Sequence, residues 1–315
     1  LKANEDTRLD ERVMQLFDFI NVLTARSPSR LLPLKKRLNI STYKVIPLTS
    51  EVGLIGWVND SKPISQKIMD YRKKNGIQID AEQSRSVVFA GGTIEKYEAL
   101  PPNKKVEAFK QGFKMTCADD LSKTLFLEST GSEHWLQRRT NYITSLAMTS
   151  IAGYIMGLGD RHTNNIMMNE KSGKLVHIDF GDCFEVTIHR NYRPEKVPFR
   201  LTRIFVNALE VSKIEGTFRL SCENVMKLLR KNSDQIIGLL NVFEYDPLLQ
   251  WMIANKNQGT NSASAVLNRI DDKLHGKDFD QNQILSVEDQ IDSLIKEATN
   301  VENLSCMYYG WGPWW

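Results

Sequence analysis

The sequence predicts an α+β fold in two unequal parts, a short N-terminal part that contains strands and a larger part that is mostly helical. Apolar residues recur at helical spacing over much of the chain, whereas short apolar runs typical of strands are confined to a few places. The 315 residues are 41% hydrophobic, which is enough for a sizeable core.

Composition and charge exclude several classes of protein. The net charge is +3 with 25% charged residues, a balance that predicts no nucleic-acid partner. Cys117, Cys183, Cys222 and Cys306 lie far apart and form no CxxC pair, so neither a disulfide framework nor a zinc site is expected, and a reducing intracellular compartment is indicated. No secretory segment and no apolar run long enough to cross a bilayer is visible.

The first elements are a helix and a pair of strands. DTRLDERVMQLFDFINVLTA, residues 6–25, predicts an amphipathic helix, with Thr7 and Asp10 as a capping box at its start. YKVIPLTSEVGLIGWV, residues 43–58, has two short apolar runs around a polar turn and predicts two strands. Polar connecting sequence is expected from there to about Thr93. The predicted buried face of the helix consists of Val13, Leu16, Phe17, Ile20 and Leu23.

Helical patterns dominate the rest of the chain. Residues 95–131 predict an inserted helical hairpin, and a long helix follows from about Ser132 to the Gly157-Leu158-Gly159 stop. Residues 200–252 are helical again, and residues 283–315 form a separate unit, a helix followed by the aromatic tail MYYGWGPWW. The two apolar stripes of the hairpin are Val106, Phe109 and Phe113, and Leu121, Leu125 and Phe126.

The residues that indicate chemistry gather in GYIMGLGDRHTNNIMMNEKSGKLVHIDFGDCFE, residues 153–185. Phosphoryl transfer needs a group that orients the attacking hydroxyl, and oxygen ligands for a metal ion on the phosphates. Protein kinases supply these with Asp-x-x-x-x-Asn and, one strand later, the Asp of DFG. Here Asp160 precedes Asn165 at that spacing, and Asp179 opens a DFG triplet after the strand-like KLVHI. Only His162 has moved, from before the Asp to after it. Each piece alone could be an ordinary turn, but the combination predicts a phosphoryl-transfer site.

GLGDRHTNNIMM followed by HIDFGD resembles the phosphatidylinositol 3-kinase-related kinases, which carry this transposed order. EDTRLDERVMQLF, VIPLTSEVGLIGWV, RRTNY, PFRLTR, FEYDPLLQW and YYGWGPWW are most similar to the target-of-rapamycin (TOR) kinases. The resemblance implies a two-lobed, protein-kinase-like fold of the PI3/PI4-kinase type. It implies four parts: a partial N-lobe and hinge in 1–58, a helical C-lobe in 59–252, a polar linker and helix in 253–282, and a FATC unit in 283–315.

The same resemblance implies roles for the central motif. Asp160 is the expected catalytic residue, which orients or deprotonates the substrate hydroxyl. His162 is expected to polarise the γ-phosphate or to assist Asp160, with a purely structural loop histidine as the alternative. Asn165 and Asp179 are the expected ligands of magnesium or manganese, because both present oxygen to a hard cation.

Lys2 matches the lysine that reaches the phosphates of ATP, with Glu5 or Asp10 as its acidic partner, a choice that the sequence leaves open. The glycine-rich loop that covers the phosphates would lie upstream of Lys2. We therefore expect the chain to be a fragment with a truncated N-lobe, and expect the fragment alone to bind ATP weakly and to have little activity.

The GLIGWV segment matches the hinge between the lobes. The backbone of Gly56 and Val58 would bond the adenine edge and Trp57 would supply an aromatic face, with an ordinary core tryptophan as the alternative. The remaining residues expected in the pocket are Tyr43, Ile55, Met167 and Ile178.

Residues 182–197 bear on the substrate. Lipid kinases of this superfamily read inositol phosphates with a basic activation segment. Here the three basic residues are equalled in number by three acidic ones, and this balance favours a serine/threonine protein substrate over a phosphoinositide. A lipid kinase and a non-catalytic scaffold stay as alternatives, although the four residues that a pseudokinase would have lost are present. The charged residues are Arg190, Arg193, Lys196, Asp182, Glu185 and Glu195.

The resemblance also implies partners and a location. Residues 95–131 match the insertion on which a WD40-repeat subunit of the TOR complexes docks, beside larger scaffold subunits, unless its stripe packs on its own lobe. The aromatic tail is expected to pack on the C-lobe, with a membrane headgroup layer as the alternative. Gly312 replaces a cysteine often found there, so Cys306 has no partner in the tail. A cytoplasmic location is expected, with endomembrane attachment or a nuclear pool left open.

Overall fold

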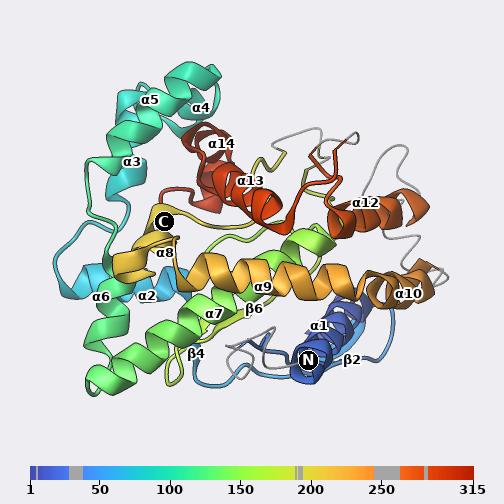
Figure 1. Ribbon diagram of the computed structural model, residues 1–315. Coiled ribbons are helices and arrows are strands. Elements are labelled where there is room, and N and C mark those ends of the chain that lie inside the picture. The colour runs from blue at the N-terminus through green and yellow to red at the C-terminus, as the bar shows by residue number, and fades with distance from the viewer. Residues whose placement is uncertain (5, 28–37, 189, 191–193, 245–262, 280–282) are drawn as a thin grey trace.

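The computed structural model describes residues 1–4, 6–27, 38–188, 190, 194–244, 263–279 and 283–315. Two small antiparallel sheets lie beside a larger helical body (Figure 1). One sheet has the strand order β1-β3-β2 and the other β4-β5-β6. The predicted α+β class is confirmed.

The first sheet and its helix form the N-terminal part of the molecule. The hairpin predicted over 43–58 is present, with Ile46 opposite Leu54, and α1 packs on β2 through the predicted apolar face. The capping box is wrong, because Thr7 makes no side-chain cap and the Asp10 carboxylate instead accepts the backbone N–H of Phe180, at 3.3 Å. The bounds are β1 Lys2–Ala3, α1 Arg8–Arg26, β2 Val45–Pro47 and β3 Val52–Ile55.

The second sheet joins segments that are distant in the sequence. Its first strand follows the hinge and pairs with a strand about a hundred residues later, with Lys62 opposite Met168. The prediction of a polar connection up to Thr93 is therefore wrong, since this segment contains a strand and two helices. Its apolar signal is weak because α2 buries the charged Lys67 and Arg72 beside Ile64 and Ile68. The bounds are β4 Ser61–Pro63, α2 Ile64–Lys74, α3 Ala81–Phe89, β5 Ile166–Asn169 and β6 Leu175–His177.

The long helix α7, Ser132–Met156, is the centre of the helical body and lies along α9 (Figure 1). It is buried on all sides from Tyr142 to Met156, and it ends where Gly157 adopts the left-handed conformation at φ 60°. The other helices of the body are α6 Asp120–Leu127, α8 Arg203–Asn207, α9 Thr217–Lys231, α10 Ser233–Glu244 and α12 Ala263–His275.

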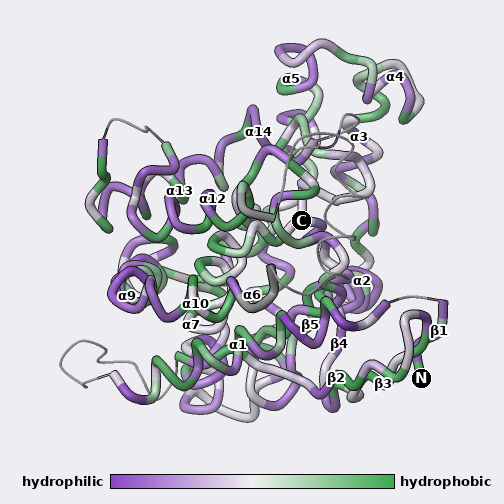
Figure 2. Tube along the Cα trace, turned by 90° about the vertical axis from the view of Figure 1, so that its right-hand side faces the viewer, coloured by the Kyte–Doolittle hydropathy of each residue, from purple (hydrophilic) through white to green (hydrophobic). Residues whose placement is uncertain are grey.

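Helices α3, α4 (Ile94–Glu98) and α5 (Pro102–Phe113) project from the body, as Figures 1 and 2 show. We call this unit, residues 81–113, the arm. The hairpin predicted over 95–131 needs correction, because α5 packs on α3 whereas α6 packs on α2, α7 and α8 in the body. Gly112 permits the close approach of α5 to α3, since a methyl group there would lie 2.6 Å from the Glu82 carbonyl oxygen.

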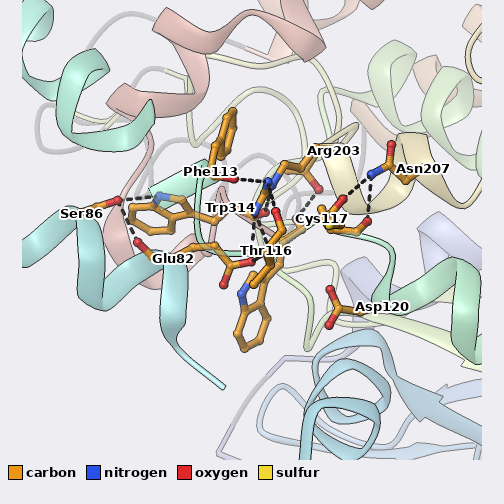
Figure 3. A network of polar contacts seen from close by, with 12 residues as sticks. Glu82, Ser86, Phe113, Thr116, Cys117, Asp120, Arg203, Asn207 and Trp314 are labelled. Carbon is orange, nitrogen blue, oxygen red and sulfur yellow. Dashed lines mark hydrogen bonds and ion pairs between the residues drawn. The ribbon is translucent and has the colours of Figure 1, made fainter. Parts of the chain in front are cut away.

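A buried polar network fastens the arm to the body (Figure 3). The Arg72 guanidinium donates to Glu82 at 2.6 and 2.7 Å and to Asp120 at 2.8 Å. Arg203 donates to the same Glu82 at 3.1 Å and to the Thr116 carbonyl at 3.0 Å. Burial opposes the ionised Glu82 side chain, but the bonds from Arg72 and Thr116 prevail and lower its pKa. Each buried charge is thus paired, as burial requires.

The C-terminal unit packs its aromatic tail between the arm and the body. The Trp314 ring is fully buried, with its centroid 5.2 Å from that of Phe109 and 5.7 Å from that of Tyr97, and its Nε1 donates to Ser86 Oγ at 3.0 Å. Trp311 and Trp315 are buried as well. The expected packing on the C-lobe is present, and contact of these three rings with a membrane surface does not fit their burial. The helices of this unit are α13 Val287–Thr299 and α14 Val301–Cys306.

Among the described residues, no helix is both long and apolar enough to cross a membrane. Gly312 lies at φ 66°, a conformation that favours glycine, which gives a physical reason for a glycine at this position of the tail.

Replacing Trp314 by alanine should destabilise the chain by about 3–5 kcal/mol, because a large buried side chain is lost and the space cannot collapse between three elements. Urea denaturation followed by circular dichroism would measure this change. Tyr308→Ala is the control, since that ring is 47% exposed and its loss should cost little. Equal effects of the two substitutions would contradict the packing described here.

Candidate active site

A cavity of about 440 Å³ lies between the first sheet, α1 and the strands β5 and β6. It brings together most of the residues predicted to bind nucleotide or metal. Of the two predicted acidic partners of Lys2, Asp10 lines the cavity with it, whereas Glu5 lies outside the described residues. The predicted residues that line the cavity are Lys2, Asp10, Tyr43, Ile55, Gly56, Trp57, Val58, Asn165, Met167, Ile178 and Asp179.

The hinge follows β3 and forms one wall of the cavity. The Gly56 N–H is already donated to the Lys44 carbonyl at 2.7 Å, so Gly56 can offer a ligand only its carbonyl oxygen. Trp57 is 87% exposed and lines the cavity, so the alternative of a core tryptophan is wrong. An exposed indole beside a backbone segment is suited to cover the face of a flat heterocycle.

The loop that carries the predicted catalytic residues begins directly after α7, and we call residues 157–165 the catalytic loop. Asp160 has φ 55°, a left-handed conformation that is unusual for a residue with a side chain. Asn165 Nδ2 donates to the Asp160 carbonyl oxygen at 3.0 Å and approaches its Oδ2 at 3.4 Å. Because the amide nitrogen faces Asp160, the amide oxygen of Asn165 is the atom that remains for a cation.

His162 lies next to the Asp160 carboxylate, with Nε2 3.8 Å from Oδ2. Its Nδ1 accepts the Asn164 N–H at 3.2 Å, which assigns the ring proton to Nε2. Burial lowers the pKa of His162 and outweighs the attraction of Asp160, so the ring is neutral at pH 7. A neutral imidazole N–H is therefore directed toward the Asp160 carboxylate.

The DFG triplet follows β6 and is fixed by its phenylalanine. The buried Phe180 ring packs edge-on against Phe17, with centroids 5.6 Å apart, and stacks on Tyr43 at 6.5 Å. Asp179 lines the cavity and has φ 61°, a left-handed conformation that is not found in a regular strand. His177, two residues before Asp179, is buried at the end of β6, and burial lowers its pKa to about 3, which suits a packed strand residue.

Arg161 was not predicted as a site residue, yet it joins the catalytic loop to the DFG strand. Its buried guanidinium donates to the carbonyl oxygens of Gly159 and Ile178, both at 2.8 Å, and to that of Asp179. Burial lowers its pKa. Its position between Asp160 and His162 was the signal that sequence reasoning could have used.

Arg200 and Glu195 were also missed. Fully buried Arg200 donates to the carbonyl oxygens of Arg161 at 3.2 Å, Trp311 at 2.9 Å, Gly312 at 2.6 Å and Trp315 at 2.7 Å. Glu195 accepts the backbone N–H of Asp160 at 2.8 Å. Neither residue lies near the motif in sequence, so spacing alone gave no signal for them.

Comparison with known proteins agrees with this geometry. Residues 1–253 match the phosphatidylinositol 3- and 4-kinase family, and residues 284–315 match the FATC domain. The whole chain is 40% identical to serine/threonine-protein kinase tor1 of Schizosaccharomyces pombe and to serine/threonine-protein kinase mTor of Drosophila melanogaster, and covers 15% of each. A structure of CtTel1 in an open conformation superposes with a TM-score of 0.83 and 29% identity over 100% of this chain, which covers 11% of that one.

The chain therefore belongs to the phosphatidylinositol 3- and 4-kinase family, as a kinase domain of the phosphatidylinositol 3-kinase-related type followed by a FATC domain. Within that group its identity to the two TOR kinases, 40%, exceeds its identity to serine-protein kinase ATM of Sus scrofa, 31%. It spans about 15% of the length of the TOR kinases that it matches. Membership of a kinase family implies ATP as the phosphate donor.

Replacing Trp57 by alanine should raise the KM for ATP about fivefold with little change in kcat, because a stacking contact of about 1 kcal/mol would be lost from nucleotide binding alone. Initial rates against ATP concentration, measured on the full-length protein that contains this chain, would show it. Trp135→Ala, at the far end of α7, is the matched control. An unchanged KM for ATP would remove Trp57 from the nucleotide site.

Proposed function

We propose that this chain is the catalytic part of a serine/threonine protein kinase that transfers the γ-phosphate of ATP to protein hydroxyls. The observation that carries the proposal is the convergence of Asn165 and Asp179 on the cavity lined by Lys2 and the hinge, with Asp160 hydrogen-bonded to Asn165. Two relatives that are 40% identical to this chain bear the name serine/threonine-protein kinase, which supports the protein-kinase class. We also propose the division into an N-lobe and hinge (1–58), a C-lobe (59–252), a linker (253–282) and a FATC unit (283–315).

The acceptor hydroxyl would bind beside Asp160, whose carboxylate accepts its proton and orients its oxygen toward the phosphate. Asn165 holds the Asp160 backbone in place through its amide nitrogen. The neutral N–H of His162 is positioned to stabilise negative charge that develops next to Asp160, a role that an imidazolium paired with the carboxylate would disturb.

The oxygens of Asn165 and Asp179 suit magnesium or manganese, and these two residues would hold the ion. Among the residues that the structure describes, no cluster of three or more His, Cys, Asp or Glu side chains could bind a metal by itself. Two ligands from the protein are what is expected for an ion that completes its shell with water and phosphate oxygens. When bound, the ion neutralises phosphate charge. Lys2, which lines the same cavity as Asp10, adds a cation to the site.

The activation segment favours a protein substrate over a phosphoinositide. Arg190 is paired with Asp182 at 2.7 Å, and Glu195 places a carboxylate against the catalytic loop. The described part of the segment therefore presents no cluster of cations for several phosphate groups; Arg193 lies outside it. A multiply phosphorylated headgroup needs several cations, so the lipid-kinase alternative is disfavoured.

Incubating the full-length protein with labelled ATP, a serine/threonine peptide library and phosphatidylinositol vesicles should label the peptides alone. Asp160→Ala should reduce the labelling at least a hundredfold, because the hydroxyl loses the group that accepts its proton. The exposed Asp60→Ala is the control. Lipid labelling that depends on Asp160 would establish the lipid kinase instead, and no labelling of either substrate would favour a scaffold.

We further propose that the arm is the docking site of a WD40-repeat subunit in a TOR-type complex, with larger scaffold subunits elsewhere and a role in growth and nutrient signalling in the cytoplasm. These assignments rest on the likeness to TOR kinases. The arm supports the first of them, because it keeps large apolar side chains exposed on α3 and α4, with Val88 at 62%, Phe89 at 49% and Ile94 at 42%. The predicted docking range thus moves from 95–131 to the arm.

The double substitution Val88→Asp, Phe89→Asp should abolish co-purification of the WD40-repeat subunit, since charges would be buried in an apolar interface. Phe126→Asp on α6 is the matched control, because Phe126 is 57% exposed but belongs to the body. Retention of the subunit by the double variant, or its loss with Phe126→Asp, would contradict docking on the arm.

A further inference from the structure

In the described part of the activation segment, the side chain of Glu195 contacts the backbone of Asp160. Its Oε1 accepts the Asp160 backbone N–H at 2.8 Å, and its own N–H donates to the Thr187 carbonyl at 3.0 Å. The Thr187 hydroxyl also hydrogen-bonds the Glu195 carboxylate. Glu195 therefore joins the segment to the catalytic loop at the residue where the chemistry is proposed to occur.

Asp160 needs such a contact because its backbone conformation is unfavourable. A backbone φ of 55° is disfavoured for a non-glycine residue, and it persists only where its surroundings hold it. Gly159 beside it is pressed against the same threonine, since a methyl group there would lie 2.0 Å from Thr187 Oγ1. The N–H of Gly159 is bonded to the Asp182 carbonyl at 2.8 Å, so both residues that precede Arg161 are held by the activation segment.

We infer that Glu195 is a positioning residue, which holds Asp160 in the conformation needed to accept the substrate proton and so determines kcat. The inference rests on the role proposed above for Asp160. It differs from that role because Glu195 acts through the Asp160 backbone and makes no contact with substrate.

The charges around Glu195 give this bond a pH dependence. Burial raises the pKa of Glu195 to about 7; the hydrogen bond from Asp160 opposes the rise, the Asp160 carboxylate adds to it and the Arg161 guanidinium opposes it. Arg200 is a further cation that interacts with it. Glu195 is thus neutral below about pH 7 and ionised above it, and the ionised form gives the stronger, charge-assisted bond to the Asp160 N–H.

Glu195 also lines a second cavity of about 370 Å³, between the activation segment, α12 and α13, and the charged groups across this cavity are already paired. Arg269 and Lys273 of α12 bind Glu185 at 3.3 and 2.6 Å, and Arg269 also binds Asp278 at 2.5 Å. On α13, Glu297 accepts a bond from Asn303 at 2.6 Å. Lys196 is exposed to solvent. These pairs leave the catalytic loop as the main influence on Glu195.

Steady-state peptide phosphorylation by the full-length protein, measured from pH 6 to pH 8, tests the inference. Glu195→Ala should lower kcat about tenfold or more, with the KM for ATP changed less than twofold, because a misplaced catalytic group costs rate and not nucleotide binding. Glu195→Gln keeps an oxygen for the Asp160 N–H but cannot ionise, so its kcat should match that of the wild type at pH 6 and exceed that of Glu195→Ala. The rise of kcat around pH 7 in the wild type should therefore be absent in this variant.

Glu297→Gln is the matched control, since it removes a carboxylate from the same cavity without touching the catalytic loop. It should retain both kcat and the pH profile of the wild type. An unchanged kcat in Glu195→Ala, or an inflection near pH 7 that persists in Glu195→Gln, would overturn the inference. If Glu195→Ala fails to fold, the isosteric glutamine variant decides through its pH profile. Wild-type protein without Asp160-dependent activity would instead refute the proposed function.

Discussion

The buried guanidinium of Arg200 is the constraint on which the arrangement of the C-lobe depends. A cation with no access to water depends on the protein for its hydrogen-bond acceptors. Arg200 donates from both terminal nitrogens to carbonyl oxygens, one from Arg161 in the catalytic loop and three from the aromatic tail, whereas its Nε has no hydrogen-bond partner among the described residues. Release of the tail would take away three of the four carbonyl acceptors of this guanidinium. The last residues of the chain are thereby part of the support of the catalytic loop.

The same logic extends to the arm. Trp314 fills the space between α3, α5 and the body, and its N–H is bonded to Ser86 on α3. Glu82, one helical turn before Ser86, is the acceptor shared by Arg72 and Arg203. Packing and ion pairing therefore converge on one face of α3. A partner bound to the outer face of the arm would act on a unit that contacts the tail and, through the tail and Arg200, the catalytic loop.

Sequence reasoning succeeded where the information is local. The offset from Asp160 to Asn165, the DFG triplet after a strand and the strand pair over 43–58 are patterns within short windows, and the structure brings the predicted pocket residues to one cavity. It failed where the partner is distant. Asp10 looked like a helix cap because the alternative acceptor role, toward Phe180, lies 170 residues away.

The pairing of α3 with α5 and the contacts of Glu195 and Arg200 were missed for the same physical reason. Each joins segments that approach only after the body has folded, and none has a periodic signal in its own segment. Gly112 illustrates the limit, because a glycine inside a predicted helix indicates some close approach but does not say to what. Buried cations bonded to backbone carbonyls are harder still, since any residue can provide the carbonyl.

Backbone carbonyl oxygens, rather than carboxylates, accept the hydrogen bonds of the Arg161 guanidinium, and this bears on the proposed reaction. Asp160 and Asp179 flank Arg161 in space, and an ion pair with either would occupy a carboxylate that the proposed reaction needs. Within the described residues Arg161 instead donates to backbone oxygens of the catalytic loop and the DFG strand, and forms no salt bridge with a carboxylate. Arg161 therefore leaves the carboxylate oxygens of Asp160 and Asp179 to the hydroxyl and the cation that the proposed reaction requires.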